Sequence, residues 1–197
     1  MSVVLGLTGS IGMGKSTTAQ MFVDEGCALW DADAAVHRLY AAGGAAVAPL
    51  GQLWPQVIQE GAVSRPALKQ VIAADPTALG RIEQIVHPLV AEDRRAFLAG
   101  TQADIIVLDI PLLFEGGAER AMDAVVVVSV APEEQKARVL ARGTMSEAQF
   151  EMIRAKQMPD AEKRARADYV VITDTLDHAR AQVRAIVSEI RSNVQDA

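Results

Sequence analysis

The residues with the clearest chemistry form one short run near the start of the chain. Gly9 to Ser16, within GLTGSIGMGKST, fits the phosphate-binding pattern G-x-x-x-x-G-K-[ST]. Glycines in such a loop let backbone N–H groups approach a phosphate, and the following helix adds the positive end of its dipole. The lysine reaches the β- and γ-phosphates, and the serine hydroxyl coordinates Mg²⁺. We therefore expect a nucleoside triphosphate and Mg²⁺ to bind at Gly9, Gly12, Met13, Gly14, Lys15, Ser16 and Thr17.

Aspartates follow two other apolar runs. Asp109 closes IIVLD, where a Walker-B carboxylate would hold Mg²⁺, although a strand end or turn is also a common place for an aspartate. Asp31 and Asp33 of WDAD would point the same way if the chain were extended there. One of them could accept a proton from an attacking hydroxyl or orient it. Asp33 could instead cap the helical stretch AAVHRLY, and one acid could cap while the other works.

The elements that must position these residues form an alternating pattern. Apolar, Val/Ile-rich runs that hardly alternate with polar residues are typical of strands covered on both faces in a parallel sheet. They are separated by helical stretches at 15–25, 132–142 and 176–193, the first ending at Gly26. We therefore expect an α/β fold, with a doubly wound five-stranded parallel sheet and the phosphate loop at its carboxyl edge. The five runs are SVVLGLT, CALWDAD, ADIIVLDIP, AVVVVSV and DYVVI.

The stretch between the second and third strands is too long for one crossover helix. It carries its own start and stop signals, including His87-Pro88 and Asp75-Pro76, where Asp75 would cap a helix beginning at Pro76. We expect an inserted helical lobe at about 36–100, within a nucleotide-binding core of residues 1–35 and 101–197.

A second departure is the basic segment 136–166. Solvated helical faces often carry such charge, but a closing lid over phosphates would need the same cations. Ser146 and Gln149 have capping-box spacing, which predicts a helix start near Glu147. The segment holds eight basic residues (Lys136, Arg138, Arg142, Arg154, Lys156, Lys163, Arg164 and Arg166) against four acidic ones.

Composition narrows the classes of partner. The net charge of −6 argues against a nucleic-acid partner. Cys27, the single cysteine, excludes an internal disulfide and is expected in the core. The histidines show no metal-ligand spacing, and no apolar run approaches the length of a membrane span. We expect a cytoplasmic monomer with no membrane or nucleic-acid partner.

Among P-loop proteins, the pattern favours a small-molecule kinase. A regulatory GTPase needs a guanine-reading Asn/Thr-Lys-x-Asp motif, which is absent, and Asn193 is the single asparagine. Motor or DNA-linked ATPases normally bring longer chains or basic surfaces. A kinase must exclude water from the transferring phosphate, which a lid and a helical lobe achieve. Another nucleotide-type kinase and a non-catalytic ATP-sensing module are the rival hypotheses.

Several motifs together resemble the dephospho-coenzyme A kinase family. They are GLTGSIGMGKST, DAD-x-x-x-H-R-L, IEQIVHPLV, VLDIPLLFE and QKARVLAR, spread over most of the chain. The resemblance implies transfer of the ATP γ-phosphate, with Mg²⁺, to the ribose 3′-hydroxyl of dephospho-coenzyme A. The family usually shows Asn-x-Gly-like residues after the last strand, where this chain has Thr173-Asp174-Thr175.

The resemblance also implies roles for individual residues. Asp33 would be the base or the hydroxyl-orienting group, and Asp31 would support it or the metal with Ser16 and Asp109. Arg138 and Arg142 would belong to the lid, one of them contacting the transferring phosphoryl group beside the catalytic Lys15. The residues expected to bind the acceptor are Asp31, Asp33, His87, Pro88, Leu112, Phe114 and Glu115.

Overall fold

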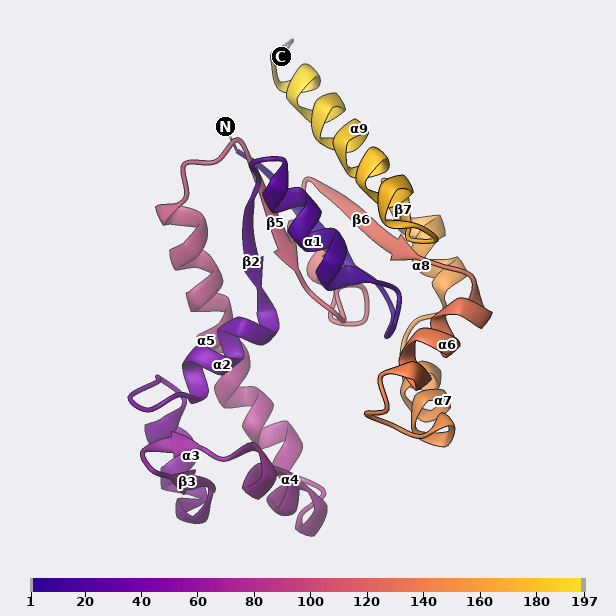
Figure 1. Cartoon of the computed structure of the whole chain (residues 1–197). Helices are drawn as coiled ribbons and strands as arrows, with labels where there is room; N and C mark the ends of the chain where they lie inside the picture. The colour runs from indigo at the N-terminus through magenta and orange to yellow at the C-terminus, as the bar shows by residue number, and fades with distance from the viewer. Residues whose placement is uncertain (1, 196–197) are drawn as a thin grey trace. The chain divides into compact units, whose positions relative to one another are not determined.

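The computed structural model describes residues 2–195 (Figure 1). Their contacts divide the chain into two compact units, which are described in turn. One comprises the described residues before Trp30 together with those after Gly100, and the other is Trp30–Gly100. Asp31 and Asp33 therefore belong to the second unit, whereas the phosphate loop and the basic segment belong to the first.

The predicted five-stranded sheet has its strands in the order β2-β5-β1-β6-β7, and all of it except Trp30 and Asp31 at the end of β2 belongs to the first unit. β1 is central: Leu5 pairs in parallel with Val107 on one side and with Ala124 on the other. β5 is buried throughout and β6 is buried from Val125 onward, because two apolar clusters pack against the sheet. The bounds are β1 Val3–Thr8, β2 Ala28–Asp31, β5 Ile105–Asp109, β6 Ala124–Ser129 and β7 Tyr169–Ile172.

The helices of this unit begin and end at recognisable signals. The helix after the phosphate loop stops before Gly26, whose φ of 86° favours glycine. Ser146 and Gln149 form the predicted capping box. α1 also contacts α9 (Figure 1). The bounds are α1 Lys15–Asp24, the short 3₁₀ helix η2 Ala118–Ala121, α6 Pro132–Ala141, α7 Glu147–Lys156, α8 Asp160–Arg166 and α9 Leu176–Gln195.

Cys27 belongs to the core of the first unit, as predicted, with 5% of its surface exposed. Burial raises the pKa of the thiol to about 11, so it stays protonated and unreactive at neutral pH. Its neighbours in this core include Leu5, Phe22 and Val183, all fully buried.

The second unit is mostly helical and has its own core, which contains the fully buried Leu50, Val57 and Ala78. A small antiparallel hairpin, not predicted from the sequence, interrupts the helices. Its two strands have two residues each, too few to show a hydrophobic period. The bounds are α2 Ala32–Tyr40, α3 Val47–Leu53, η1 Pro55–Val57, β3 Ile58–Gln59, β4 Ala62–Val63, α4 Arg65–Ala74 and α5 Ala78–Gly100.

Two predicted boundaries in this unit are wrong. Asp75 does not cap a helix starting at Pro76: its carboxylate accepts the Thr77 N–H (2.8 Å) and hydroxyl (2.7 Å), a local turn that delays α5 to Ala78. Nor does the chain break at His87-Pro88, since Pro88 lies inside α5. Proline removes one helical hydrogen bond, a cost that apolar residues of α5 packed into the core offset.

Candidate active site

The phosphate loop joins β1 to α1 in a conformation that requires glycine. Gly12 and Gly14 have φ of 80° and 91°, in the left-handed region. A Cβ on Gly12 would lie 2.4 Å from Cγ2 of Val139, and one on Gly9 would lie 2.8 Å from the carbonyl oxygen of Val128. The loop is therefore packed tightly against α6 and β6.

Lys15 and Asp109, predicted on separate grounds, meet in the structure. Asp109 ends β5, and Leu7 near the end of β1 pairs with it across the sheet. The Lys15 ammonium donates to Oδ1 of Asp109, which is 2% exposed. The low exposure of this ion pair strengthens it. It holds the lysine of the loop at the carboxyl edge of the sheet.

The donor atoms near the loop suit a magnesium ion bound together with a nucleotide. The first turn of α1 carries the Ser16 hydroxyl, and the Asp109 carboxylate lies at the adjacent strand end. Within residues 2–195 no group of three or more His, Cys, Asp or Glu residues could hold a metal on its own. Mg²⁺ typically takes one or two protein oxygens and fills its octahedron with water and substrate phosphates, so this donor set fits.

Thr173, just after β7, ties the phosphate loop to α6. Its hydroxyl donates to the carbonyl of Met13 at 2.7 Å, and its carbonyl accepts from Arg138. Arg138 also pairs with Glu134, one turn earlier on α6. Met13 itself is 2% exposed, and its sulfur accepts the Val130 N–H at 3.2 Å. Sequence reasoning missed the role of Thr173, because a lone threonine carries no motif.

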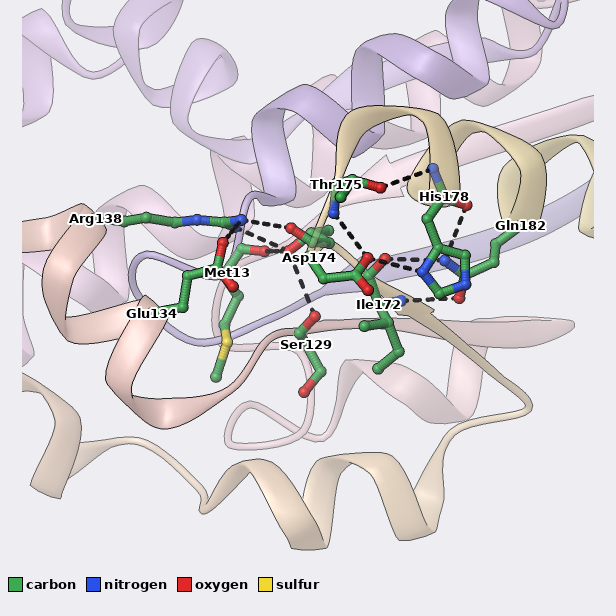
Figure 2. Close-up of polar contacts among 10 residues, drawn as sticks. Met13, Ser129, Glu134, Arg138, Ile172, Asp174, Thr175, His178 and Gln182 are labelled. Atoms are coloured by element: carbon green, nitrogen blue, oxygen red, sulfur yellow. Dashed lines mark hydrogen bonds and ion pairs between the residues drawn. The ribbon is translucent and has the colours of Figure 1, made fainter.

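The turn after Thr173 is held by a second set of hydrogen bonds (Figure 2). Oδ1 of Asp174 accepts from the Thr175 N–H and contacts Nδ1 of His178, both at 2.7 Å. The hydrogen bond from His178, and then that from Thr175, hold the pKa of the Asp174 carboxyl below its usual range. Gln182 bonds both backbone groups of Ile172, which fixes the end of β7.

A cavity of about 310 Å³ lies beside the loop in the first unit. Thr17 and Thr18 line one part of it, and Asp174 and Thr175 line another. Arg138 and Arg142 contribute cations. The cavity adjoins Gly14, so a nucleotide whose phosphates lie in the loop could place its base there.

The basic segment is largely neutralised by ion pairs. Arg138 is committed to Glu134 and Thr173, whereas Arg142 is exposed and makes no ion pair with any residue the structure describes. The segment's other pairs are Lys136–Glu147, Arg154–Glu151, Lys163–Glu115, Arg164–Asp160 and Arg166–Glu119.

In the second unit, Asp31 rather than Asp33 caps α2. Oδ1 of Asp31 accepts the Ala34 N–H at 2.9 Å, and Asp33 lies exposed in the first helical turn. The prediction that both acids lie on an extended chain and point the same way is therefore wrong. The helix begins at Ala32, earlier than AAVHRLY indicates, because the aspartate before it satisfies the free N–H groups.

Asp93 of α5 fixes the segment from the end of β2 into α2, where Asp31 and Asp33 lie. Its role was not predicted from the sequence. It accepts from the indole N–H of Trp30 at 2.7 Å and pairs with Arg38 of α2. Trp30 is 2% exposed, so its N–H needs such a partner. The hydrogen bond from Arg38 is the main reason why the pKa of Asp93 lies below its ordinary value. No motif marks Asp93.

The remaining predicted acceptor residues differ in accessibility. His87 and Pro88 are exposed on α5 in the second unit. In the first unit, Leu112 is 50% exposed, whereas Phe114 is 5% exposed, with the Arg166 guanidinium 4.5 Å from its ring centroid.

Glu115 is already bonded within the first unit. Its Oε1 accepts the Met158 N–H at 2.8 Å and lies 3.0 Å from the Lys163 ammonium. Burial alone would raise the pKa of Glu115, but these two partners outweigh it and hold the pKa below its usual value.

Comparisons with known proteins agree with this geometry. The family model described as dephospho-CoA kinase matches residues 3–177. A dephospho-CoA kinase of Ruegeria pomeroyi is 72% identical over 192 residues, covering 98% of each chain. A crystal structure from Thermus thermophilus has a TM-score of 0.84 at 32% identity, over 95% of this chain and 97% of that one.

A dephospho-CoA kinase structure from Campylobacter jejuni shares the fold, with a TM-score of 0.74 at 21% identity over 98% of this chain and 99% of that one. The match over residues 3–177 and the 72% identity to the Ruegeria protein go beyond the fold. The chain belongs to the dephospho-CoA kinase family.

Proposed function

We propose that the protein transfers the γ-phosphate of ATP to the ribose 3′-hydroxyl of dephospho-coenzyme A, giving coenzyme A and ADP, the last step of coenzyme A biosynthesis. The observation that carries the proposal is the 72% identity, over 98% of each chain, to a curated dephospho-CoA kinase. The phosphate loop with its Lys15–Asp109 pair supports it, because a kinase must hold the donor phosphates against a cation.

On the donor side, the work is positioning and charge neutralisation. The N–H groups from Gly12 to Thr17 would hold the β- and γ-phosphates, and Lys15 would neutralise their charge. Ser16 and Asp109 would hold Mg²⁺, whose role when bound is to offset the negative charge that develops on the phosphates. The base would lie in the 310 Å³ cavity beside Thr173–Leu176.

Of the two arginines predicted for the lid, Arg142 is assigned to the transferring phosphoryl group. Arg138 already donates to Thr173 and pairs with Glu134, so it holds the base-side turn against α6. Arg142, at the end of α6, is exposed and has no ion-pair partner among residues 2–195. A cation without a fixed partner can move onto a phosphoryl group at a smaller electrostatic cost.

On the acceptor side, Asp33 is assigned to the attacking hydroxyl. Its carboxylate is exposed and is not the cap of α2, so it is available to orient a hydroxyl or take its proton. Oδ1 of Asp31 caps α2, and the other carboxylate oxygen of Asp31 would support Asp33 or the Mg²⁺ ion. The substrate contacts predicted for His87, Pro88, Leu112, Phe114 and Glu115 stay predictions.

An acceptor panel tests the proposed function. The protein is incubated with ATP-Mg²⁺ and, separately, with dephospho-coenzyme A, nucleosides and other hydroxyl-bearing metabolites, and ADP release is measured. We expect release that depends on dephospho-coenzyme A. Release that depends on another acceptor would favour a different kinase, and no release with any acceptor would favour an ATP-sensing module.

The location, partners and oligomeric state of the enzyme are proposed from the sequence alone. We propose a cytoplasmic monomer that binds neither nucleic acid nor membrane, in keeping with the net charge of −6 for the nucleic-acid part. Separately, none of the described helices is long and apolar enough to cross a bilayer. Size-exclusion chromatography with light scattering measures the oligomeric state, and a mass of twice 21.0 kDa would contradict a monomer.

A further inference from the structure

Ile11, in the phosphate loop, has both backbone polar groups bonded to side chains from outside the loop. Its carbonyl accepts from Nε2 of Gln135 at 2.7 Å, and its N–H donates to Oε1 of Gln157 at 3.1 Å. A loop peptide lacks the regular partners of a helix or strand, so such bonds decide its orientation. The loop conformation at Ile11 therefore depends on two glutamines.

The two glutamines come from different parts of the first unit. Gln135 lies on α6, is 3% exposed, and belongs to the helix that packs directly against Gly12. Gln157 is half-buried and directly follows α7, in the segment predicted as a lid. The Gln135 contact thus belongs to the packed core, whereas the Gln157 contact joins the lid segment to the phosphate loop.

The residue after Gln157 is anchored as well. The Met158 N–H donates to Glu115 at 2.8 Å, and Glu115 also pairs with Lys163 of α8, which is fully buried. Arg166 at the end of α8 pairs with Glu119 at 2.7 Å. The turn between α7 and α8 is consequently fixed on both sides, to the phosphate loop and to the segment after β5.

A cavity of about 350 Å³ separates the inner side of this turn from the loop. Ser10 and Met13 line it from the loop, and Gln157, Met158 and Asp160 line it from the turn. If the bond between Gln157 and Ile11 were lost, the turn would lose a direct hold on the phosphate loop, and water could reach the loop more easily through this space.

We propose that Gln157 is a positioning residue that latches the lid segment onto the phosphate loop and so directs the γ-phosphate to the acceptor rather than to water. The inference rests on the proposed function. With the latch broken, a water molecule replaces the acceptor hydroxyl as the attacking group. ATP then gives ADP and inorganic phosphate with release of a proton, whereas coenzyme A formation falls.

The test compares Gln157→Met with Gln20→Met. Methionine keeps the length of glutamine without the acceptor oxygen. Gln20 is an exposed residue of α1 whose amide bonds only Asp24, one turn on, among the described residues. For each protein, inorganic phosphate and coenzyme A are measured in the same reaction, and thermal unfolding is followed by circular dichroism. A merely structural role would lower stability and both products together.

We expect Gln157→Met to raise the ratio of inorganic phosphate to coenzyme A by about three- to tenfold, the factor that one net hydrogen bond supplies. Gln20→Met should keep the wild-type ratio. Gln157→Ala, a second variant, should change the ratio in the same direction. An unchanged ratio in both Gln157 variants would overturn the latch.

The outcome for the proposed function is read separately. If the wild-type protein forms no coenzyme A, that function fails, and the latch is then judged on ATP hydrolysis without acceptor. A three- to tenfold rise in hydrolysis for Gln157→Met would still support the latch. Hydrolysis equal to that of the wild type would overturn it.

Discussion

Asp33 is the residue whose chemistry is easiest to separate from its structural role. Because Asp31 caps α2, replacing Asp33 leaves the helix start intact. We predict that Asp33→Asn lowers kcat by about 10²–10⁴, the range for loss of a general base, with little change in the KM for ATP. Steady-state kinetics with dephospho-coenzyme A measure both constants. A near-normal kcat would show that Asp33 takes no part in the chemical step.

Arg138 and Arg142 should fail in different ways when truncated. Arg142→Ala removes a cation with no ion-pair partner among the described residues, and we predict a loss in kcat of about 10³ or more. Arg138→Ala releases Thr173 and the turn that lines the base cavity, so its main effect should be a higher KM for ATP. Kinetics at varied ATP separate the two, and the reverse assignment would show as the opposite pattern.

At the scale of elements, the contact between the phosphate loop and α6 makes Gly12 irreplaceable. Gly12→Ala adds both the strain of a φ of 80° and a Cβ 2.4 Å from Val139. Gly143 also has a positive φ (65°) but has nothing within 4 Å of an added Cβ, so Gly143→Ala carries the strain without the clash.

We predict that Gly12→Ala costs about 1–3 kcal/mol more stability than Gly143→Ala, as overpacking typically does. It should also weaken ATP binding, whereas Gly143→Ala should not. Thermal unfolding and calorimetric titration with ATP provide the comparison. Equal effects of the two substitutions would contradict this prediction, because they would mean that α6 can shift to accommodate the added methyl group.

The bond of α5 to α2 through Asp93 makes a contribution to stability that depends on pH. The folded-state pKa of Asp93 is lowered, chiefly by Arg38, so the contribution is present above the unfolded pKa of about 3.9. It is lost as the pH falls through the lower folded pKa. Asparagine keeps an acceptor for Trp30 but removes the charge that pairs with Arg38.

We predict that Asp93→Asn lowers the free energy of unfolding by about 0.5–1 kcal/mol at pH 7, since Arg38 is 54% exposed, and by less at pH 3. Urea unfolding followed by tryptophan fluorescence reports on the second unit, which contains both tryptophans, Trp30 and Trp54. Glu83→Gln, at an exposed position on the same helix, is the control. A difference that is the same at both pH values would contradict the ionic contribution.

The strands of the five-stranded sheet and the phosphate loop were predictable because each carries a local signal. An apolar run such as IIVLD predicts a buried strand, and the pattern G-x-x-x-x-G-K-[ST] has one common geometry. The helix starts in the second unit were less predictable, since Asp31 and Asp33 both match a cap and tertiary packing decides between competing positions.

The residues that hold the site in place could not be predicted. Thr173, Gln157 and Asp93 bond partners that are distant in the chain, at Met13, Ile11 and Trp30 respectively. Thr, Gln and Asp are common residues, and their roles appear only when the fold brings the partners together. The acceptor could be named only through the family resemblance, because no single residue type identifies dephospho-coenzyme A.

As a whole molecule, the protein is proposed to place the γ-phosphate of ATP on a single hydroxyl, the ribose 3′-hydroxyl of dephospho-coenzyme A. The most direct measurement follows the reaction of ATP, Mg²⁺ and dephospho-coenzyme A by phosphorus NMR, with the γ-phosphate isotopically labelled. We predict one new monoester, carrying the label and coupled to the ribose 3′-hydrogen, formed in equal amount to ADP. Label found at another position, or only in inorganic phosphate, would contradict it.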